Sequence, residues 1–125
     1  MKIRKITYPT PIEKIENPLC ANIDVFVETD NGLHFTMTVC TPQFYLYYME
    51  KEGIDFVTTG PPDIIVKSLQ EDVIKSALTA YCEDDGYWMK LYFLAGADDG
   101  PFTSENLDEA MKRREKRDRG PLLLP

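Results

Sequence analysis

The chain has 125 residues, 43% of them hydrophobic, which is enough for a single domain with a real core. No apolar run approaches the ~20 residues of a membrane-spanning helix, and the first residues lack the apolar stretch of a signal peptide. Residues 1–110 hold 19 acidic and 8 basic side chains, whereas residues 111–125 hold two and six, giving a net charge of −7. Such an acidic body repels nucleic acid and attracts basic partners, although its charge also serves solubility alone.

The cysteines Cys20, Cys40 and Cys82 are odd in number and form no CxxC pair. This pattern predicts free thiols rather than a disulfide framework or a cysteine-rich zinc site, and it fits a reducing cytosol. We therefore expect a cytoplasmic protein with no metal and no cofactor. Residues 1–18 contain three prolines and predict an irregular arm, to which Ile3 and Ile6 can add a short edge strand.

Residues 23–41 alternate apolar and polar side chains on both sides of Asp30-Asn31-Gly32 and predict a β-hairpin. A two-residue turn at Asn31-Gly32 would mix charged and apolar side chains on both faces. A three-residue loop with a left-handed Gly32 pairs Val27 with Phe35 and separates the faces cleanly, so we predict that register. The polar face then carries the following side chains: Asp24, Phe26, Glu28, His34, Thr36 and Thr38.

A helix is predicted from Pro42 to about Glu52, with Thr41 as N-cap and Gly53 as C-cap. Its apolar side chains span an arc of roughly 200°, wider than one core contact needs, with Tyr47 on the polar side. The members of this arc are Phe44, Tyr45, Leu46, Tyr48 and Met49. One possible use of the Phe44–Met49 segment is a homodimer closed by Tyr45, Tyr48 and Met49.

Further elements follow in order. Residues 54–58 predict a short strand, and Asp63–Lys67 predict a central strand of β-branched residues. Ser68 and Glu71 form a capping box that opens a helix to about Cys82. One half of this helix is apolar, comprising Leu69, Val73, Ile74, Ala77, Leu78, Ala80 and Tyr81.

The acidic turn Glu83-Asp84-Asp85-Gly86 precedes an alternating run, Tyr87–Leu94, which we predict as the final strand. This places Trp88 and Tyr92 on the open sheet face. They would join Asp24, Phe26 and Glu28 there, with the carboxylates of Glu83, Asp84 and Asp85 nearby. Exposed aromatic rings with a charged rim are typical of a protein-binding patch, unless the arm or the tail covers them.

The order of elements predicts an α+β fold, with two helices packed on one face of a mainly antiparallel sheet of four to five strands. We expect an arm (1–18), one domain (19–97) and a polar, basic tail (98–125). Residues 104–119 can form an external helix capped at Ser104, which either docks on a partner subunit or stays mobile. Its basic stretch, Lys112–Arg119, lacks the interleaved aromatic residues of nucleic-acid modules, so nucleic-acid binding is disfavoured.

Nucleophilic catalysis needs a base close to the nucleophile, and the predicted register leaves His34 on a solvated face beside Glu28. No phosphate-binding glycine motif is present. We therefore predict a protein that is not an enzyme.

The stretch Asp24–Leu94, with VFVETDNGLHFTMTVCTPQFY and DIIVKSLQEDVIKSAL, resembles a family of small bacterial immunity proteins. These belong to polymorphic-toxin and contact-dependent-inhibition systems, and the likeness is to the immunity protein 8 type. Thr41-Pro42 and Asp63–Ile74 carry the similarity. The resemblance implies a non-catalytic protein that neutralises a cognate toxin by masking its basic active site. A homodimeric housekeeping or regulatory subunit is the alternative.

Overall fold

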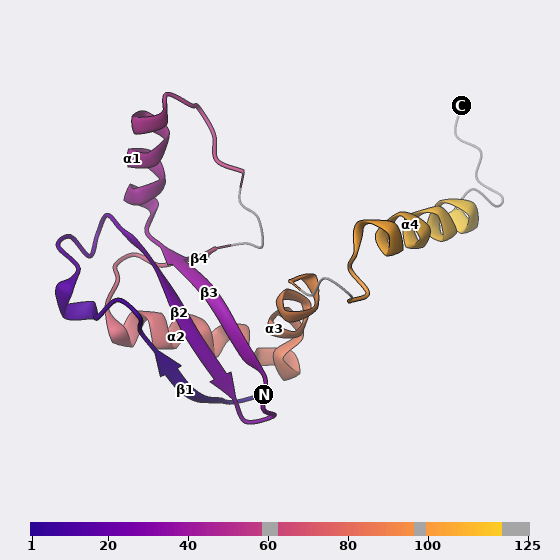
Figure 1. Ribbon diagram of the computed structural model, residues 1–125, viewed down its shortest axis with the longest axis horizontal. Helices are drawn as coiled ribbons and strands as arrows, with labels where there is room; N and C mark the ends of the chain where they lie inside the picture. Colours follow the sequence, from indigo (N-terminus) through magenta and orange to yellow (C-terminus); the bar gives the residue numbers. More distant parts are fainter. Residues whose placement is uncertain (59–62, 97–99, 119–125) are drawn as a thin grey trace. The chain divides into compact units, whose positions relative to one another are not determined.

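The computed structural model describes residues 1–58, 63–96 and 100–118 (Figure 1). The chain divides into two compact units, Met1–Met89 and Lys90–Pro125. Within the described part of the chain, no helix is both long enough and apolar enough to cross a membrane. The predicted domain boundary at residue 97 falls outside the described residues.

The first unit contains a four-stranded sheet in the order β1-β2-β3-β4. Its strands are β1 (Ile3–Thr7), β2 (Asn22–Thr29), β3 (His34–Cys40) and β4 (Ile64–Ile65), and a short 3₁₀ helix, η1, spans Ile12–Lys14. The first three strands are antiparallel, whereas β4 runs parallel to β3. The fold is therefore α+β with a mixed sheet, and the expected edge strand at Ile3 and Ile6 is confirmed as β1.

The hairpin has the predicted register. Ile23 pairs with Val39, Val25 with Met37, and Val27 with Phe35. Gly32 is left-handed, with φ of 82°, and its N–H donates to the carbonyl of Thr29 at 3.1 Å. This is the three-residue loop that separates apolar from polar side chains.

The core lies between the apolar face of the hairpin and helix α2 (Glu71–Tyr81), which crosses the sheet in Figure 1. Ile74 and Leu78 of α2 are fully buried, whereas Glu71, Asp72 and other polar residues of the helix face out, as predicted. The remaining core side chains come mainly from β2, β3 and the segment before α2: Ile23, Val25, Val27, Phe35, Met37, Val39, Ile64, Val66 and Leu69.

Helix α1 (Pro42–Glu52) has the predicted ends. The Oγ1 of Thr41 accepts a hydrogen bond from the N–H of Phe44 at 3.3 Å, and Gly53 ends the helix at φ of 68°. However, α1 contributes no buried residue. The expectation of two helices packed on one sheet face is therefore wrong for α1, and in the first unit this role belongs to α2.

Three local predictions between the two helices are also wrong. The described residues 54–58 form no strand, and the run at 63–67 supplies only the two-residue edge strand β4 instead of a central strand. Ser68 does not cap α2, because the helix begins at Glu71 after Gln70, which provides no side-chain cap. The backbone N–H of Leu69 instead donates to the carbonyl of Pro18 at 2.8 Å, which holds this segment extended before the helix.

The run Tyr87–Leu94 is helical and belongs to α3 (Glu83–Ala95), so the predicted final strand is wrong. The predicted turn at 83–86 is present at its start, with Asp84, Asp85 and Gly86 in left-handed conformations. The second unit contains the last residues of α3, from Lys90 on, and the whole of α4 (Ser104–Asp118). Helix α4 fits the expected tail helix, although its cap is Thr103, whose Oγ1 accepts from the N–H of Asn106 at 3.2 Å.

Candidate protein-binding surfaces

The open face of the sheet carries three of the predicted binding residues together. Asp24 lies opposite Thr38 and accepts its hydroxyl hydrogen bond at 3.0 Å. Phe26, one pair along, is 46% exposed. Glu28 lies opposite His34, and its carboxylate is 3.6 Å from the guanidinium of Arg4 on β1. We call this set of side chains the open sheet face.

The predicted aromatic partners of that face do not belong to the sheet. Trp88 and Tyr92 lie one turn apart on α3, so their alternation along a strand with Tyr87 and Met89 does not exist. Trp88 is 54% exposed and makes an edge-on contact with Tyr87, with ring centroids 5.5 Å apart. Met89 is fully buried. The prediction that Trp88 and Tyr92 share a sheet face with Asp24, Phe26 and Glu28 is therefore wrong, because Tyr87–Leu94 is not a strand.

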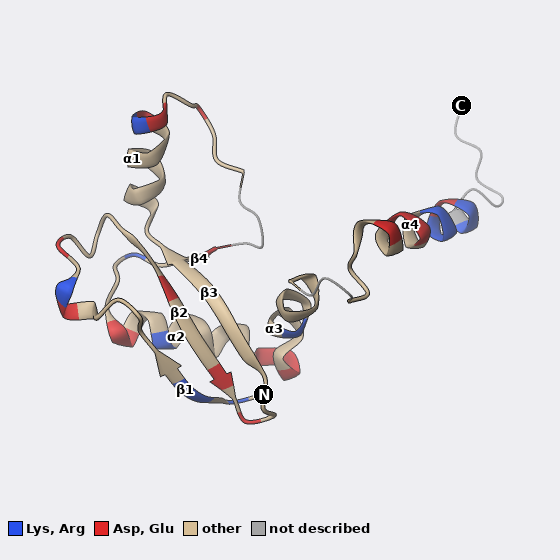
Figure 2. Ribbon diagram, in the orientation of Figure 1, with Lys and Arg blue, Asp and Glu red and all other residues tan. Residues whose placement is uncertain are grey.

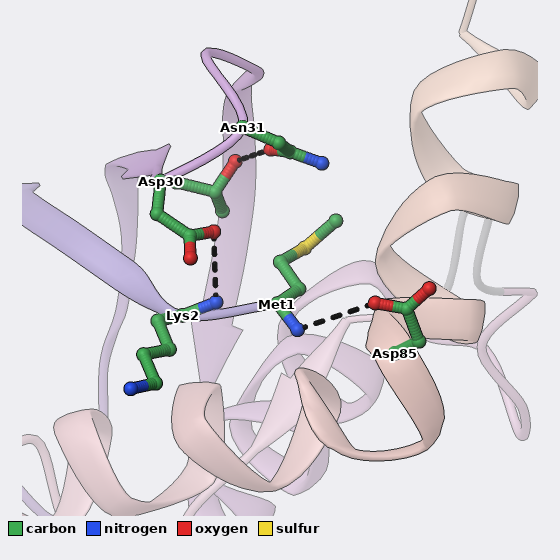
Figure 3. Close-up of polar contacts among 6 residues, drawn as sticks. Met1, Lys2, Asp30, Asn31 and Asp85 are labelled. Atoms are coloured by element: carbon green, nitrogen blue, oxygen red, sulfur yellow. Dashed lines mark hydrogen bonds and ion pairs between the residues drawn. The ribbon is translucent and has the colours of Figure 1, made fainter.

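The carboxylates of Glu83, Asp84 and Asp85 are exposed at the start of α3. Asp85 lies 3.4 Å from the amino group of Met1 (Figure 3). Among the described residues, no group of three His, Cys, Asp or Glu side chains is arranged to hold a metal ion.

Helix α1 presents a group of exposed apolar side chains. Leu46, Tyr47 and Tyr48 are exposed, and Phe44 is half-buried. Phe44 stacks on Tyr48 with centroids 6.3 Å apart and also contacts Tyr47 at 6.4 Å. We call these four side chains the α1 surface. The wide apolar arc of the helix indicated this surface. The prediction that Tyr47 lies on the polar side is wrong, since its ring contacts Phe44 in the aromatic cluster.

The segment after α1 extends this exposed region. Ile54 and Phe56 are both exposed, the latter by 68%. Exposed charged side chains lie at the end of the helix and in the same segment, namely Glu50, Lys51, Glu52 and Asp55. Three of these four are acidic, so the apolar surface has a rim of net negative charge.

A polar cluster that the sequence did not indicate fixes the base of α1. The hydroxyl of Tyr45 donates to Oδ2 of Asp63 at 2.7 Å, and the thiol of Cys40 donates to the same oxygen at 3.4 Å. Burial, together with the charge of Asp63, raises the pKa of Cys40 to about 11. Burial and the hydrogen bond to Asp63 likewise raise the pKa of Tyr45.

This cluster is structural in character. A thiol with a raised pKa stays protonated at neutral pH, and the thiolate is the nucleophilic form. Cys40 is also buried. The cluster thus joins the end of β3, the first turns of α1 and the residue before β4, and leaves the α1 surface exposed.

Comparisons with protein-family models, with curated proteins and with solved structures found no match to this chain.

Proposed function

We propose that this chain is a non-catalytic protein-binding protein of the immunity type, which covers the basic active site of a toxin domain in the cytosol. The observation that supports this proposal is α1, a capped helix with no buried residue and an exposed aromatic cluster. Exposed apolar patches of this kind mark binding sites in soluble proteins, and Tyr is enriched among the residues that dominate binding energy.

The charge around the α1 surface favours a basic partner over a second copy of the chain. Glu50, Glu52 and Asp55 form its acidic rim, with Lys51 as the basic member. Two copies meeting through α1 would bring two net acidic rims together, and like charges at an interface oppose association. A basic toxin domain would meet the same rim with complementary charge. The aromatic cluster would then supply the desolvated centre of the interface.

The experiment is co-purification with the product of the neighbouring gene, followed by affinity measurement. We expect Tyr47→Ala to weaken binding by about tenfold or more, since truncation of a central Tyr commonly removes over 1.4 kcal/mol. The melting temperature should stay unchanged because Tyr47 is exposed. Met111→Ala, also highly exposed but on α4, is the matched control and should bind normally.

Phe26→Ala separates the α1 surface from the open sheet face. A loss of affinity on Phe26→Ala with none on Tyr47→Ala would move the binding site to the sheet and contradict the role of α1. The absence of any toxic neighbouring product would contradict the immunity function itself. A tight dimer in light scattering that Tyr48→Ala dissociates would favour the alternative, a homodimeric regulatory subunit.

A further inference from the structure

A groove of about 980 Å³ runs along the outer edge of β1. On one side it is lined by consecutive residues from Met1 to Ile6 and by Tyr8, and on the other by α2 and by Cys82 and Glu83, which follow it. Because successive side chains of a strand point to opposite faces, a lining that includes every residue of the run indicates that the backbone edge itself borders the groove. We propose that this edge binds an extended segment of a protein partner, which adds antiparallel to β1 as a fifth strand and carries acidic side chains toward the open sheet face.

The direction of the backbone groups supports strand addition. Thr29 exchanges its backbone hydrogen bonds with the hairpin loop through Gly32 and Leu33. Alternation along β2 then turns the backbone groups of Glu28 and Phe26 toward β1, where they face Lys5 and Thr7. The N–H and C=O of Ile6, which lies between these two, consequently point to the outer edge. No described strand pairs with that edge.

The floor and walls of the groove suit alternating side chains. Ile3 and Ile6 are half-buried and turn toward the α2 side of the sheet, so a partner's apolar side chains would pack beside them. Tyr8 lines the same groove as Glu71 at the start of α2, so both supply polar groups there. The groove therefore has an apolar floor and a polar end.

Charge on the open sheet face selects the partner. Lys5 pairs with Glu28, which in turn pairs with His34, and Arg4 also contacts Glu28. The position beyond Lys5 in this cross-strand row is the one that an added strand would occupy. An acidic side chain there continues the alternation of charge, whereas a second copy would bring another basic β1 to the edge. Lysine on an edge strand is a common protection against self-pairing.

The start of β1 is held in place before any partner binds. The N–H of Lys2 donates to Oδ1 of Asp30 at 3.0 Å, and the N–H of Asp30 donates to the carbonyl of Lys2 at 2.9 Å. Figure 3 shows the first of these contacts beside the hairpin loop. A strand that is already fixed loses little conformational entropy on pairing, which favours addition at this edge.

The test uses the full chain and two end-blocked nine-residue peptides, one alternating valine with glutamate and the other valine with lysine. Fluorescence anisotropy measures affinity, and amide hydrogen exchange reports the N–H of Ile6. We expect the glutamate peptide to bind about tenfold more tightly, because an opposite charge beside Lys5 is favourable whereas a like charge there is unfavourable. Exchange at Ile6 should slow when this peptide binds.

Lys5→Glu should remove or reverse the preference, and Lys67→Glu, an equal change at an exposed lysine outside the groove, should leave it intact. Equal affinity for both peptides, binding that leaves Ile6 exchange unchanged, or no binding at millimolar peptide would each overturn the proposal. These outcomes do not depend on the α1 surface, so failure here and failure of the proposed function are distinguishable.

Discussion

Three consecutive left-handed residues redirect the chain between α2 and the helical run that follows. Asp84 has φ and ψ of 53° and 44°, Asp85 of 56° and 31°, and Gly86 of 71° and 30°. This conformation costs a residue with a side chain about 1–2 kcal/mol. At Gly86 a side chain would meet a second obstacle, because an added Cβ would lie 2.6 Å from Sδ and 3.0 Å from Cβ of Met1. The glycine therefore answers both a backbone and a packing requirement.

We expect Gly86→Ala to lower the free energy of unfolding by about 2–3 kcal/mol, the sum of left-handed strain and displacement of Met1. Gly53→Ala is the matched control, since Gly53 has a similar φ of 68° but nothing within 4 Å of an added Cβ. It should cost about 1 kcal/mol from strain alone. Urea denaturation measures both, and equal losses would contradict the packing role of Gly86.

At the scale of elements, the structure could be predicted wherever all the residues that determine it are neighbours in the sequence. The hairpin register follows from side-chain alternation and Gly32, and the ends of α1 follow from Thr41 and Gly53. These signals need no distant partner. The same holds for the polar face of the sheet, so Asp24, Phe26 and Glu28 came together as expected.

The run Tyr87–Leu94 shows why the other half of the predicted patch was not predictable. Seven of its eight residues are apolar, so an alternating strand and a helix fit equally well. The left-handed turn at Asp84–Gly86 leads into a helix, and two of its three residues are not glycine. The prediction of a central strand at residues 63–67, before α2, was wrong for a different reason. Its β-branched residues do enter the sheet, but only the fold determines that β4 is a parallel edge of two residues.

The cluster of Cys40, Tyr45 and Asp63 joins three elements and predicts a pH dependence. The folded-state pKa of Cys40, about 11, lies above its ordinary value of 9. The unfolded thiol thus loses its proton first, so this contribution to stability is complete below pH 9 and is lost as the pH rises through 11. The raised pKa of Tyr45 acts in the same direction.

We therefore expect the free energy of unfolding to fall between pH 8.5 and 10.5, as measured by urea denaturation at constant ionic strength. Cys40→Ser keeps a donor toward Asp63 but removes the titrating thiol. The free energy of unfolding of this variant should therefore fall less steeply over the same pH range. Some decline should remain, because burial also raises the pKa of Cys82. A wild-type stability that is flat or rising over this range would contradict the assignment.

At the scale of the whole chain, charge is divided between the units. The first unit holds most of the acidic residues, some of which Figure 2 shows on β2 and at the start of α2, whereas α4 is acidic in its first half and mainly basic in its second. Composition predicted an acidic stretch up to residue 110 and a basic one after it, and this boundary falls inside α4 rather than between the two units. Which apolar surface lies beside the acidic residues could not be predicted from composition. The structure was needed to show that α1 has no buried residue.

An acidic body that binds a basic toxin domain should steer its partner electrostatically. We expect the association rate to fall about tenfold or more between 50 and 500 mM salt, while the dissociation rate changes little. Glu52→Lys at the rim of α1 should lower the association rate and its salt dependence. Tyr47→Ala should instead speed dissociation at every salt concentration, since it removes a contact of the bound state. Stopped-flow kinetics with the co-purified partner distinguishes the two effects. A rate independent of salt would show that the acidic surface serves solubility alone.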